Sequence, residues 1–246
     1  MRGLIVTLGA TALLFGGASQ ARDIDFSGDL TGFAQDEFRL ISEDLAAVLS
    51  YKPLQPPKPL GVVGLDVGVE WTSTFVESSD SWQQATGSDI ETFPMARLSA
   101  QKGLPFGIDI GGTYASAPDS DVEIIGGQLR FALMRGGIAR PAVGIRAAHT
   151  RLTGHDDLDF DTSSLDISIS KGFGMLTPYG GVGQVWANSE YTGDEPLLQG
   201  NLDKESFSDS KVYAGLRMNF VLFKLTVEAD QTGDVSSLSG KFSIGF

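Results

Sequence analysis

Apolar and polar side chains alternate along most of the chain from residue 61 onward. In VGLDVGVEW (63–71), every second residue from Val63 to Trp71 is apolar, whereas Asp66 and Glu70 fall between them. A period of two predicts a β-strand with one apolar and one polar face. The same alternation occurs at 106–114, 125–133, 143–147, 165–169, 212–220, 223–230 and 239–246 and, less regularly, at 94–102 and 177–188. The pattern therefore predicts ten strands.

The predicted connections differ in length. KGLP, RGGIAR, KGFGM and the turn near 221–222 are short, whereas those around 76–92, 116–122, 152–159, 188–207 and 231–238 are mostly longer and polar. Short turns at one end and longer loops at the other are typical of a transmembrane β-barrel with both termini at the short-turn end. An exported soluble β-sandwich also alternates. Charged residues on the second face of nearly every strand favour the barrel. We therefore expect an all-β, antiparallel, up-and-down transmembrane β-barrel over 61–246.

The first 21 residues have the pattern of a secretory signal peptide. Arg2 precedes an apolar run from Leu4 to Phe15, and Ser19 and Ala21 stand at the −3 and −1 positions of a cleavage site. The alternative, a membrane anchor helix, needs about 20 apolar residues, and this run is shorter. We expect removal of residues 1–21.

Residues 22–60 form a separate segment. DEFRLISEDLAAVLSY (36–51) places its apolar residues at helical spacing, which predicts an amphipathic helix, and the proline-rich KPLQPPKPLG ends it. We expect this helix on the periplasmic side, either as a cap beneath the barrel mouth or as a plug in the lumen. Because barrel diameter grows with strand number, a ten-stranded lumen filled by side chains leaves little room, which favours the cap.

The leader, the strand rhythm and the last strand resemble the outer-membrane β-barrel proteins of Gram-negative bacteria. The resemblance is to the broad class, including uncharacterised proteobacterial barrels, with no close characterised member. It implies a location in the outer membrane, with membrane lipids, lipopolysaccharide and the barrel-assembly machinery as partners. In that class a terminal aromatic strand resembles the assembly signal. Phe242, Ile244 and Phe246 are therefore expected to face lipid and to carry that signal.

Composition excludes several classes of function. The net charge of −13 argues against nucleic-acid binding, which needs a basic surface. The absence of cysteine excludes thiol chemistry and cysteine-based metal sites. We expect no cofactor. The oligomeric state stays open.

Inward charges are predicted to form a belt around the lumen. Arg130 and Arg146 lie almost symmetrically about the turn near residue 138, and Asp109 and Asp166 stand at similar heights on the flanking strands. Two adjacent arginines need anionic partners. The belt is either a structural salt-bridge network or a constriction for an anion or substrate. Its further candidate members are Glu70, Arg97, Arg217 and Glu228.

The predicted loops are acidic. Asp157, Asp159 and Asp161 share one face of an extended chain and form a Ca²⁺ candidate, although EF-hand spacing is lacking. Solvated acidic loops are the simpler interpretation, and divalent ions bridging them to lipopolysaccharide phosphates is a third. We otherwise expect no metal site.

Enzymatic activity has little support in the sequence. Only His149 and His155 offer a catalytic base, and no hydrolase, metalloprotease or nucleotide-binding motif occurs. A lipid hydrolase would need a serine that only the fold can place beside a histidine. The prediction is a non-enzymatic barrel, either a narrow channel for small polar or ionic solutes or a structural envelope protein. The alternatives are a rim hydrolase acting on lipid or peptide, and an accessory subunit that docks through the helix at 36–51.

Overall fold

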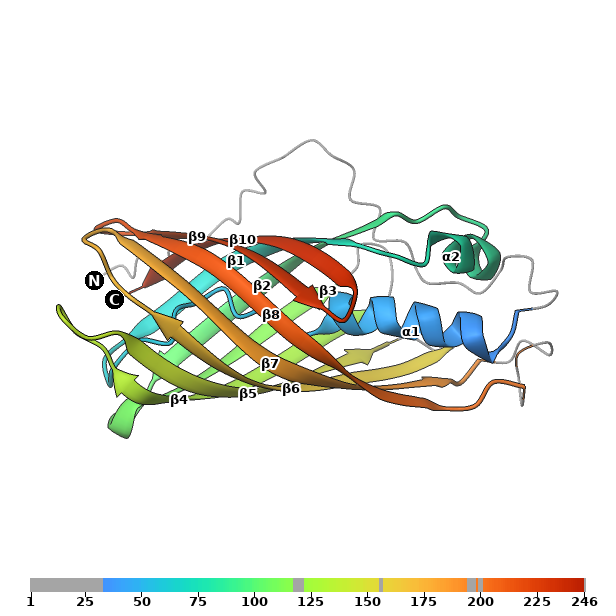
Figure 1. Cartoon of the computed structure of the whole chain (residues 1–246), viewed down its shortest axis with the longest axis horizontal. Coiled ribbons are helices and arrows are strands. Elements are labelled where there is room, and N and C mark those ends of the chain that lie inside the picture. Colours follow the sequence, from blue (N-terminus) through green and yellow to red (C-terminus); the bar gives the residue numbers. More distant parts are fainter. Residues whose placement is uncertain (1–32, 117–121, 155–156, 194–197, 199–200, 246) are drawn as a thin grey trace, which may run out of the picture.

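The chain forms a closed barrel of ten antiparallel strands in the computed structural model, which describes residues 33–116, 122–154, 157–193, 198 and 201–245 (Figure 1). Each strand pairs with its neighbours in the sequence, and β1 closes the barrel against β10. The strands are β1 (Leu65–Phe75), β2 (Thr92–Gly103), β3 (Ile108–Ser116), β4 (Glu123–Arg135), β5 (Ala142–Thr153), β6 (Leu158–Ser170), β7 (Leu176–Tyr191), β8 (Glu205–Asn219), β9 (Lys224–Thr232) and β10 (Val235–Gly245). The prediction of an antiparallel ten-stranded barrel is confirmed.

Several strands are longer than the alternation predicted. β6 begins at Leu158 instead of residue 165, because its first half carries polar residues on its outer face and so gives no apolar signal. The connection between β9 and β10 is a two-residue turn, not a long loop. The helix α2 (Ser79–Thr86), which ends at Gly87 in the left-handed conformation, lies in the connection predicted to be an open loop. Within the described residues, no helix is long and apolar enough to cross a bilayer.

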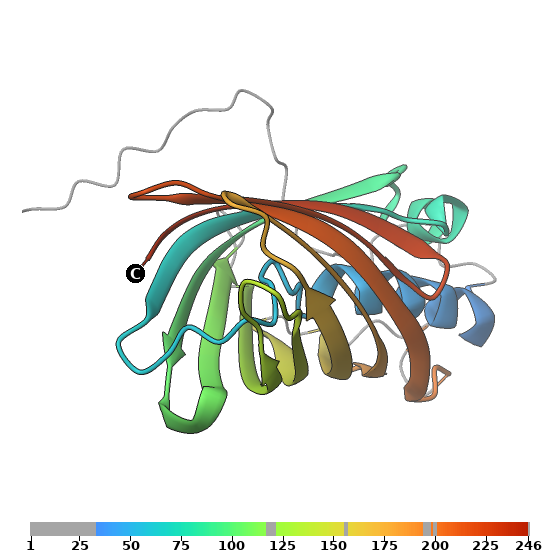
Figure 2. The same ribbon diagram turned by 60° about the vertical axis from the view of Figure 1, so that its left-hand side comes forward.

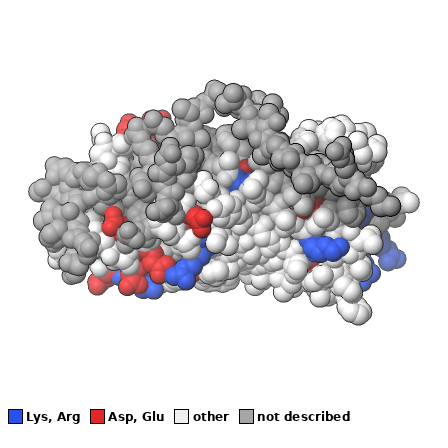
Figure 3. All heavy atoms as spheres, turned by 180° about the vertical axis from the view of Figure 1, so that it is seen from behind, with Lys and Arg blue, Asp and Glu red and all other residues white. Residues whose placement is uncertain are grey.

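The two faces of the wall differ in polarity as the alternation predicts. On β1, Val69 is 52% exposed on the outside, whereas the side chain of Glu70 points inward and is 2% exposed. In the view of Figure 3, the middle of the wall carries few charged side chains, and charges gather nearer the two ends. In a closed barrel, the backbone N–H and C=O groups of each strand pair with those of its neighbours, and no strand edge is left free. Together with a polar interior and an apolar outer surface, this is the arrangement of a membrane-spanning barrel.

The N-terminal segment lies inside the barrel. The helix α1 (Gln35–Leu49) begins at the end that carries α2 and runs into the lumen, and residues 50–64 continue to the opposite end, where β1 starts (Figures 1 and 2). The expectation that the helix lies at the end of the short turns and caps the mouth is therefore wrong. The helix enters from the end of the longer connections and occupies the lumen. The predicted signal peptide, residues 1–21, lies outside the described residues.

Candidate functional site

The apolar face of α1 is covered by the barrel and by α2. Phe38 and Ile41 are fully buried, and they share a core cluster with Trp82 of α2 and Phe160 of β6. This cluster lies at the end of the barrel with the longer connections, where the strands extend beyond the apolar belt. The helix therefore has its amphipathic face satisfied within its own chain.

One carboxylate joins the two helices. Asp44 of α1 accepts hydrogen bonds from the backbone N–H of Glu77 at 3.1 Å, from that of Ser78 at 3.3 Å and from Nε1 of Trp82 at 3.0 Å. Burial raises the pKa of Asp44 above 3.8, and these hydrogen bonds partly oppose that effect. The contacts hold the connection between β1 and β2 over the entrance of the lumen.

The polar face of α1 is bound to the wall by side-chain contacts. The hydroxyls of Ser42 and Ser189 on β7 are 2.9 Å apart, and both residues are buried. Near the start of the helix, the side chain of Gln35 donates to Glu205 of β8 and to the backbone carbonyl of Asp203. The helix is thus fixed in rotation as well as in depth.

Buried lysines hold the chain where α1 ends. Lys52 pairs with Asp230 of β9 at 2.8 Å and donates to the hydroxyl of Ser237 at 3.0 Å. Lys211 of β8 donates to the backbone carbonyl of Tyr51 at 3.0 Å. These cations lie among carboxylates in the interior, as a buried charge requires.

Charged side chains of the wall bind the backbone of the last turn of α1 and of the linker that follows it, residues 50–60. Each of three inward arginines donates to a backbone carbonyl: Arg97 to Val48 at 2.6 Å, Arg217 to Leu54 at 2.9 Å and Arg130 to Pro56 at 2.9 Å. Two carboxylates accept from backbone N–H groups: Glu228 from Leu54 at 3.0 Å and Asp109 from Leu60 at 3.1 Å. The proline-rich segment has no regular backbone ladder, and the wall supplies partners instead.

The four central residues of the predicted belt are cross-strand neighbours. Arg130 stands opposite Asp109 on β3 and opposite Arg146 on β5, and Arg146 stands opposite Asp166 on β6. The Nε atom of Arg130 lies 3.1 Å from Asp109, and that of Arg146 lies 2.9 Å from Asp166. Each arginine therefore has its own carboxylate. Arg146 also lies over the ring of Tyr51, 5.6 Å from its centroid.

The other predicted members of the belt make different contacts. Glu70 stands opposite Arg97 in the ladder, but its carboxylate pairs with Lys241 at 3.1 Å. Arg217 donates to the hydroxyl of Thr226 at 3.1 Å, and Glu228 accepts from the hydroxyl of Tyr179 at 2.7 Å. The sequence did not indicate two further groups of buried charges. Lys52 and Lys211 lie with Asp230 where α1 ends, and Lys241 pairs with Asp66 and Glu70. As a functional site the belt remains a prediction.

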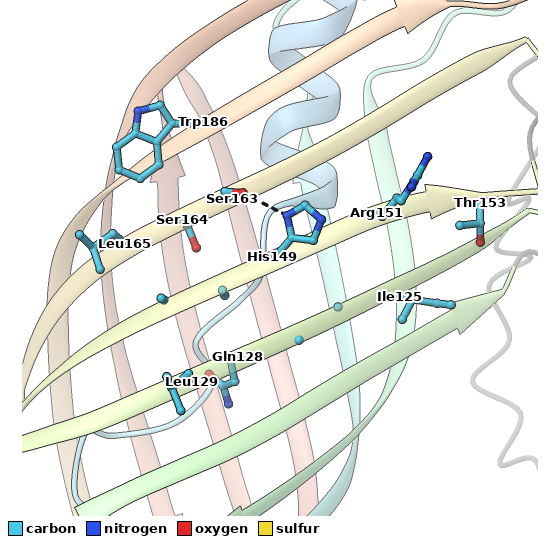
Figure 4. Close-up of a pocket in the computed structure, with 14 residues that line it drawn as sticks. Ile125, Gln128, Leu129, His149, Arg151, Thr153, Ser163, Ser164, Leu165 and Trp186 are labelled. Carbon is cyan, nitrogen blue, oxygen red and sulfur yellow. Dashed lines mark hydrogen bonds between the residues drawn. The ribbon is translucent and has the colours of Figure 1, made fainter.

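His149 lies on the outer wall and not at the rim of the lumen. It points outward from β5, and its Nδ1 is 3.0 Å from the hydroxyl of Ser163 on β6 (Figure 4). The pair lies in a shallow groove of about 850 Å³ on the outer surface of β4 to β7. Ile125, Leu129, Leu165 and Trp186 form the apolar part of its lining. The second histidine, His155, lies outside the described residues.

The acidic candidate for Ca²⁺ is dispersed: Asp159 and Asp161 lie on the outer face of β6, and Asp157 precedes this strand. Asp159 pairs with Arg151 at 3.3 Å, and Asp161 accepts from the amide of Asn188 at 3.2 Å. Among the described residues, no three histidine, aspartate or glutamate side chains come together in a group that could hold a metal ion. The geometry therefore gives Asp157, Asp159 and Asp161 no shared cation site.

The last strand has the expected faces. Phe242 and Ile244 point outward and are 47% and 62% exposed, and Phe242 stacks on Phe223 with ring centroids 5.6 Å apart. Phe246 lies outside the described residues. The role of these residues as an assembly signal stays a prediction.

Comparisons with known proteins find solved structures of low similarity. No family model and no curated protein matches the chain. Among solved structures, the N-terminal β-barrel domain of Pseudomonas aeruginosa OprF matches with 13% identity and a TM-score of 0.36, over 74% of this chain and 97% of that one. The KdgM porin matches with 8% identity and a TM-score of 0.35, over 73% and 99%. The Ail protein of Yersinia pestis, in complex with sucrose octasulfate, matches with 11% identity and a TM-score of 0.29, over 74% and 97%.

Proposed function

We propose that this protein is an integral outer-membrane barrel that its own N-terminal segment closes, with a structural and non-enzymatic role. The observation that carries the proposal is the set of contacts along residues 48–60. Inward side chains of β2, β3, β4, β8 and β9 bind the backbone or side chains of this segment. The charges that would select ions in an open channel are used to hold the segment in place.

The occupied lumen supports a structural barrel over a narrow channel. An open channel needs a continuous polar path, whereas here the charged belt faces the backbone of the chain itself. In planar lipid bilayers we expect the folded wild-type protein to give no single-channel steps, beside a general porin as a positive control. Folding is verified by circular dichroism and by a heat-dependent shift in gel mobility. Reproducible steps of one size from the folded protein would contradict the proposal and favour the channel.

Docking to an envelope complex through 36–51 has less support. Phe38, Ile41 and Leu45 of this helix are buried against the barrel and α2. A partner would have to displace these contacts to reach the apolar face.

A lipid hydrolase on the outer wall gains one element from the geometry. Ser163 lies within hydrogen-bond distance of His149, so a candidate nucleophile and base are adjacent. However, among the described residues no carboxylate forms an ion pair with His149, so the third group that orients the base in a catalytic triad is lacking. Release of fatty acid from a phospholipid by the wild-type protein, lost in both Ser163→Ala and His149→Ala, would favour this second function.

A further inference from the structure

Each short turn of the barrel exposes a large apolar side chain. The turns join β2 to β3, β4 to β5, β6 to β7 and β8 to β9, and these side chains are Phe106, Ile138, Phe173 and Val221. Each of them is at least 62% exposed, so the chain itself covers little of their surface. Apolar side chains gathered at one end of a protein indicate contact with a partner or a membrane.

The apolar belt approaches the thickness of a membrane only when these turns are part of it. On the outer face of β6, the residues are apolar from Leu165 to Ile169 and polar from Ser163 toward the other end. The chain from Leu165 to Phe173 spans about 26 Å at about 3.3 Å per residue, or roughly 20 Å along the barrel axis at a strand tilt of about 40°. The apolar band of such barrels is about 25 Å tall. The turns therefore lie where lipid tails meet headgroups.

Three cations lie around two neighbouring turns. Arg135 and Arg140 are exposed on either side of Ile138, and neither forms an ion pair with a described residue. Lys171, which begins the next turn, donates to the backbone carbonyl of Ile138 at 2.6 Å. This contact joins the two turns, and a carbonyl does not neutralise the charge of the ammonium. The positive charge of the cluster is therefore available to an anion.

The carboxylates at this end of the barrel are buried and already paired. Asp66 lies 2.9 Å from the ammonium of Lys224 and 3.3 Å from that of Lys241, and Asp109 pairs with Arg130. Both carboxylates are shielded from water by the barrel. They therefore do not offset the exposed cations.

The two ends of the barrel differ in charge. Two further lysines, Lys58 and Lys102, add to the positive charge at the short turns. In the view of Figure 3, acidic side chains gather at the end of the longer connections. Exposed carboxylates of the described residues at that end include Asp89, Asp159 and Glu190. The short-turn end thus complements a negatively charged partner, and the other end does not.

We propose that the β4–β5 and β6–β7 turns bind the headgroup of one anionic glycerophospholipid. Ile138 and Phe173 contact the upper parts of the acyl chains, and the cluster of Arg135, Arg140 and Lys171 surrounds the phosphate. The short turns of an outer-membrane barrel lie on the periplasmic side, so these turns meet the phospholipid leaflet and not the lipopolysaccharide. A zwitterionic headgroup is disfavoured because its ammonium would approach the same cations. The inference rests on the barrel spanning the outer membrane and is independent of whether the lumen is occupied.

The first test measures lipid retention by the full-length folded protein in detergent, using native mass spectrometry. The probes are phosphatidylglycerol and phosphatidylethanolamine with identical acyl chains, at equal concentrations. We expect phosphatidylglycerol to be retained about tenfold more tightly, which corresponds to about 1.4 kcal/mol. Equal retention of the two lipids, or no retained lipid on a folded barrel, would overturn the proposal.

Matched charge variants locate the site. Arg135→Gln combined with Arg140→Gln should lower the retention of phosphatidylglycerol about tenfold, a change of about 1.4 kcal/mol. Arg151→Gln combined with Lys204→Gln removes the same charge at the other end, where both cations are already paired, and should leave retention unchanged. If the two double variants lose retention equally, the turns are not the site and the proposal is wrong.

A fluorescent label tests whether the turns reach the lipid. The chain has no cysteine, so Ile138→Cys provides a single site for a thiol-reactive fluorophore. In phosphatidylglycerol vesicles, lipids brominated on the acyl chains should quench this label and leave a label at Asp89→Cys unquenched. An unquenched label at residue 138 would place the turns in water, favour an acidic periplasmic protein as the partner and overturn the proposal. Single-channel steps from the wild type would contradict the occupied lumen alone and leave these results unchanged.

Discussion

Removal of the Arg130 guanidinium tests whether the buried belt stabilises the barrel as paired charges. Arg130→Met removes the partner of Asp109 and the donor to the carbonyl of Pro56. The side chains of Arg130 and Asp109 are 5% and 2% exposed, so the carboxylate left behind is shielded from water. Breaking a buried ion pair from one side costs about 3–5 kcal/mol. We expect a loss of stability in that range.

The assay is urea unfolding in phospholipid vesicles, followed by the fluorescence of the three tryptophans. Lys204→Met breaks an exposed ion pair with Glu190 and serves as the control, with an expected cost below about 1 kcal/mol. The double variant Arg130→Met with Asp109→Asn should recover part of the loss, because the unpaired charge is removed and the amide oxygen can still accept from Leu60. The reasoning is refuted if Arg130→Met costs no more than Lys204→Met, or if the double variant costs the sum of the two single ones.

Two further predictions concern the seat of α1 and the exit of the linker. Because burial raises the pKa of Asp44 above 3.8, the native state binds this proton more tightly than the unfolded chain. Its contribution to stability should therefore fall as pH rises from 3.8 through the raised pKa, and Asp44→Asn should remove that slope from unfolding curves measured against pH. An added Cβ at Gly103 would lie 1.9 Å from the carbonyl oxygen of Gly61, so Gly103→Ala should destabilise the barrel by about 1–3 kcal/mol. Gly137→Ala, which meets nothing within 4 Å, should not; equal unfolding midpoints for these two variants would contradict the close approach.

The strands and the central charge pairs could be predicted because period-two alternation reports local geometry. Arg130 and Arg146 flank a short turn, so their opposition in the ladder follows from counting residues back from that turn. The first half of β6 was not predicted, because beyond the apolar belt its outward residues are polar, and Leu158 and Phe160 face inward into the core around α1. The pair of His149 and Ser163 could not be predicted either. The register of β5 against β6 decides which residues stand opposite each other, and the connection between these strands does not fix that register in the sequence.

The position of α1 could not be predicted because helical spacing shows an apolar face without showing what covers it. A ten-stranded lumen filled by large side chains would leave little room for a helix. In the structure, inward glycines make the space: an added Cβ at Gly126 would lie 3.2 Å from the ring of Tyr51, and one at Gly144 would lie 3.1 Å from Pro57. Glycine on the inward face of a strand, beside serine and threonine, is the signal that indicates an occupied lumen.

A disulfide between α1 and the wall tests most directly whether the N-terminal segment occupies the lumen. The chain has no cysteine, so Ser42→Cys with Ser189→Cys introduces the only pair of thiols. The two hydroxyls are 2.9 Å apart, and we expect rapid oxidation of the membrane-embedded protein to a disulfide, seen as loss of both free thiols. Ser42→Cys with Ser208→Cys, whose second residue faces outward on β8, should keep both thiols. Free thiols in both variants after oxidation would contradict an occupied lumen.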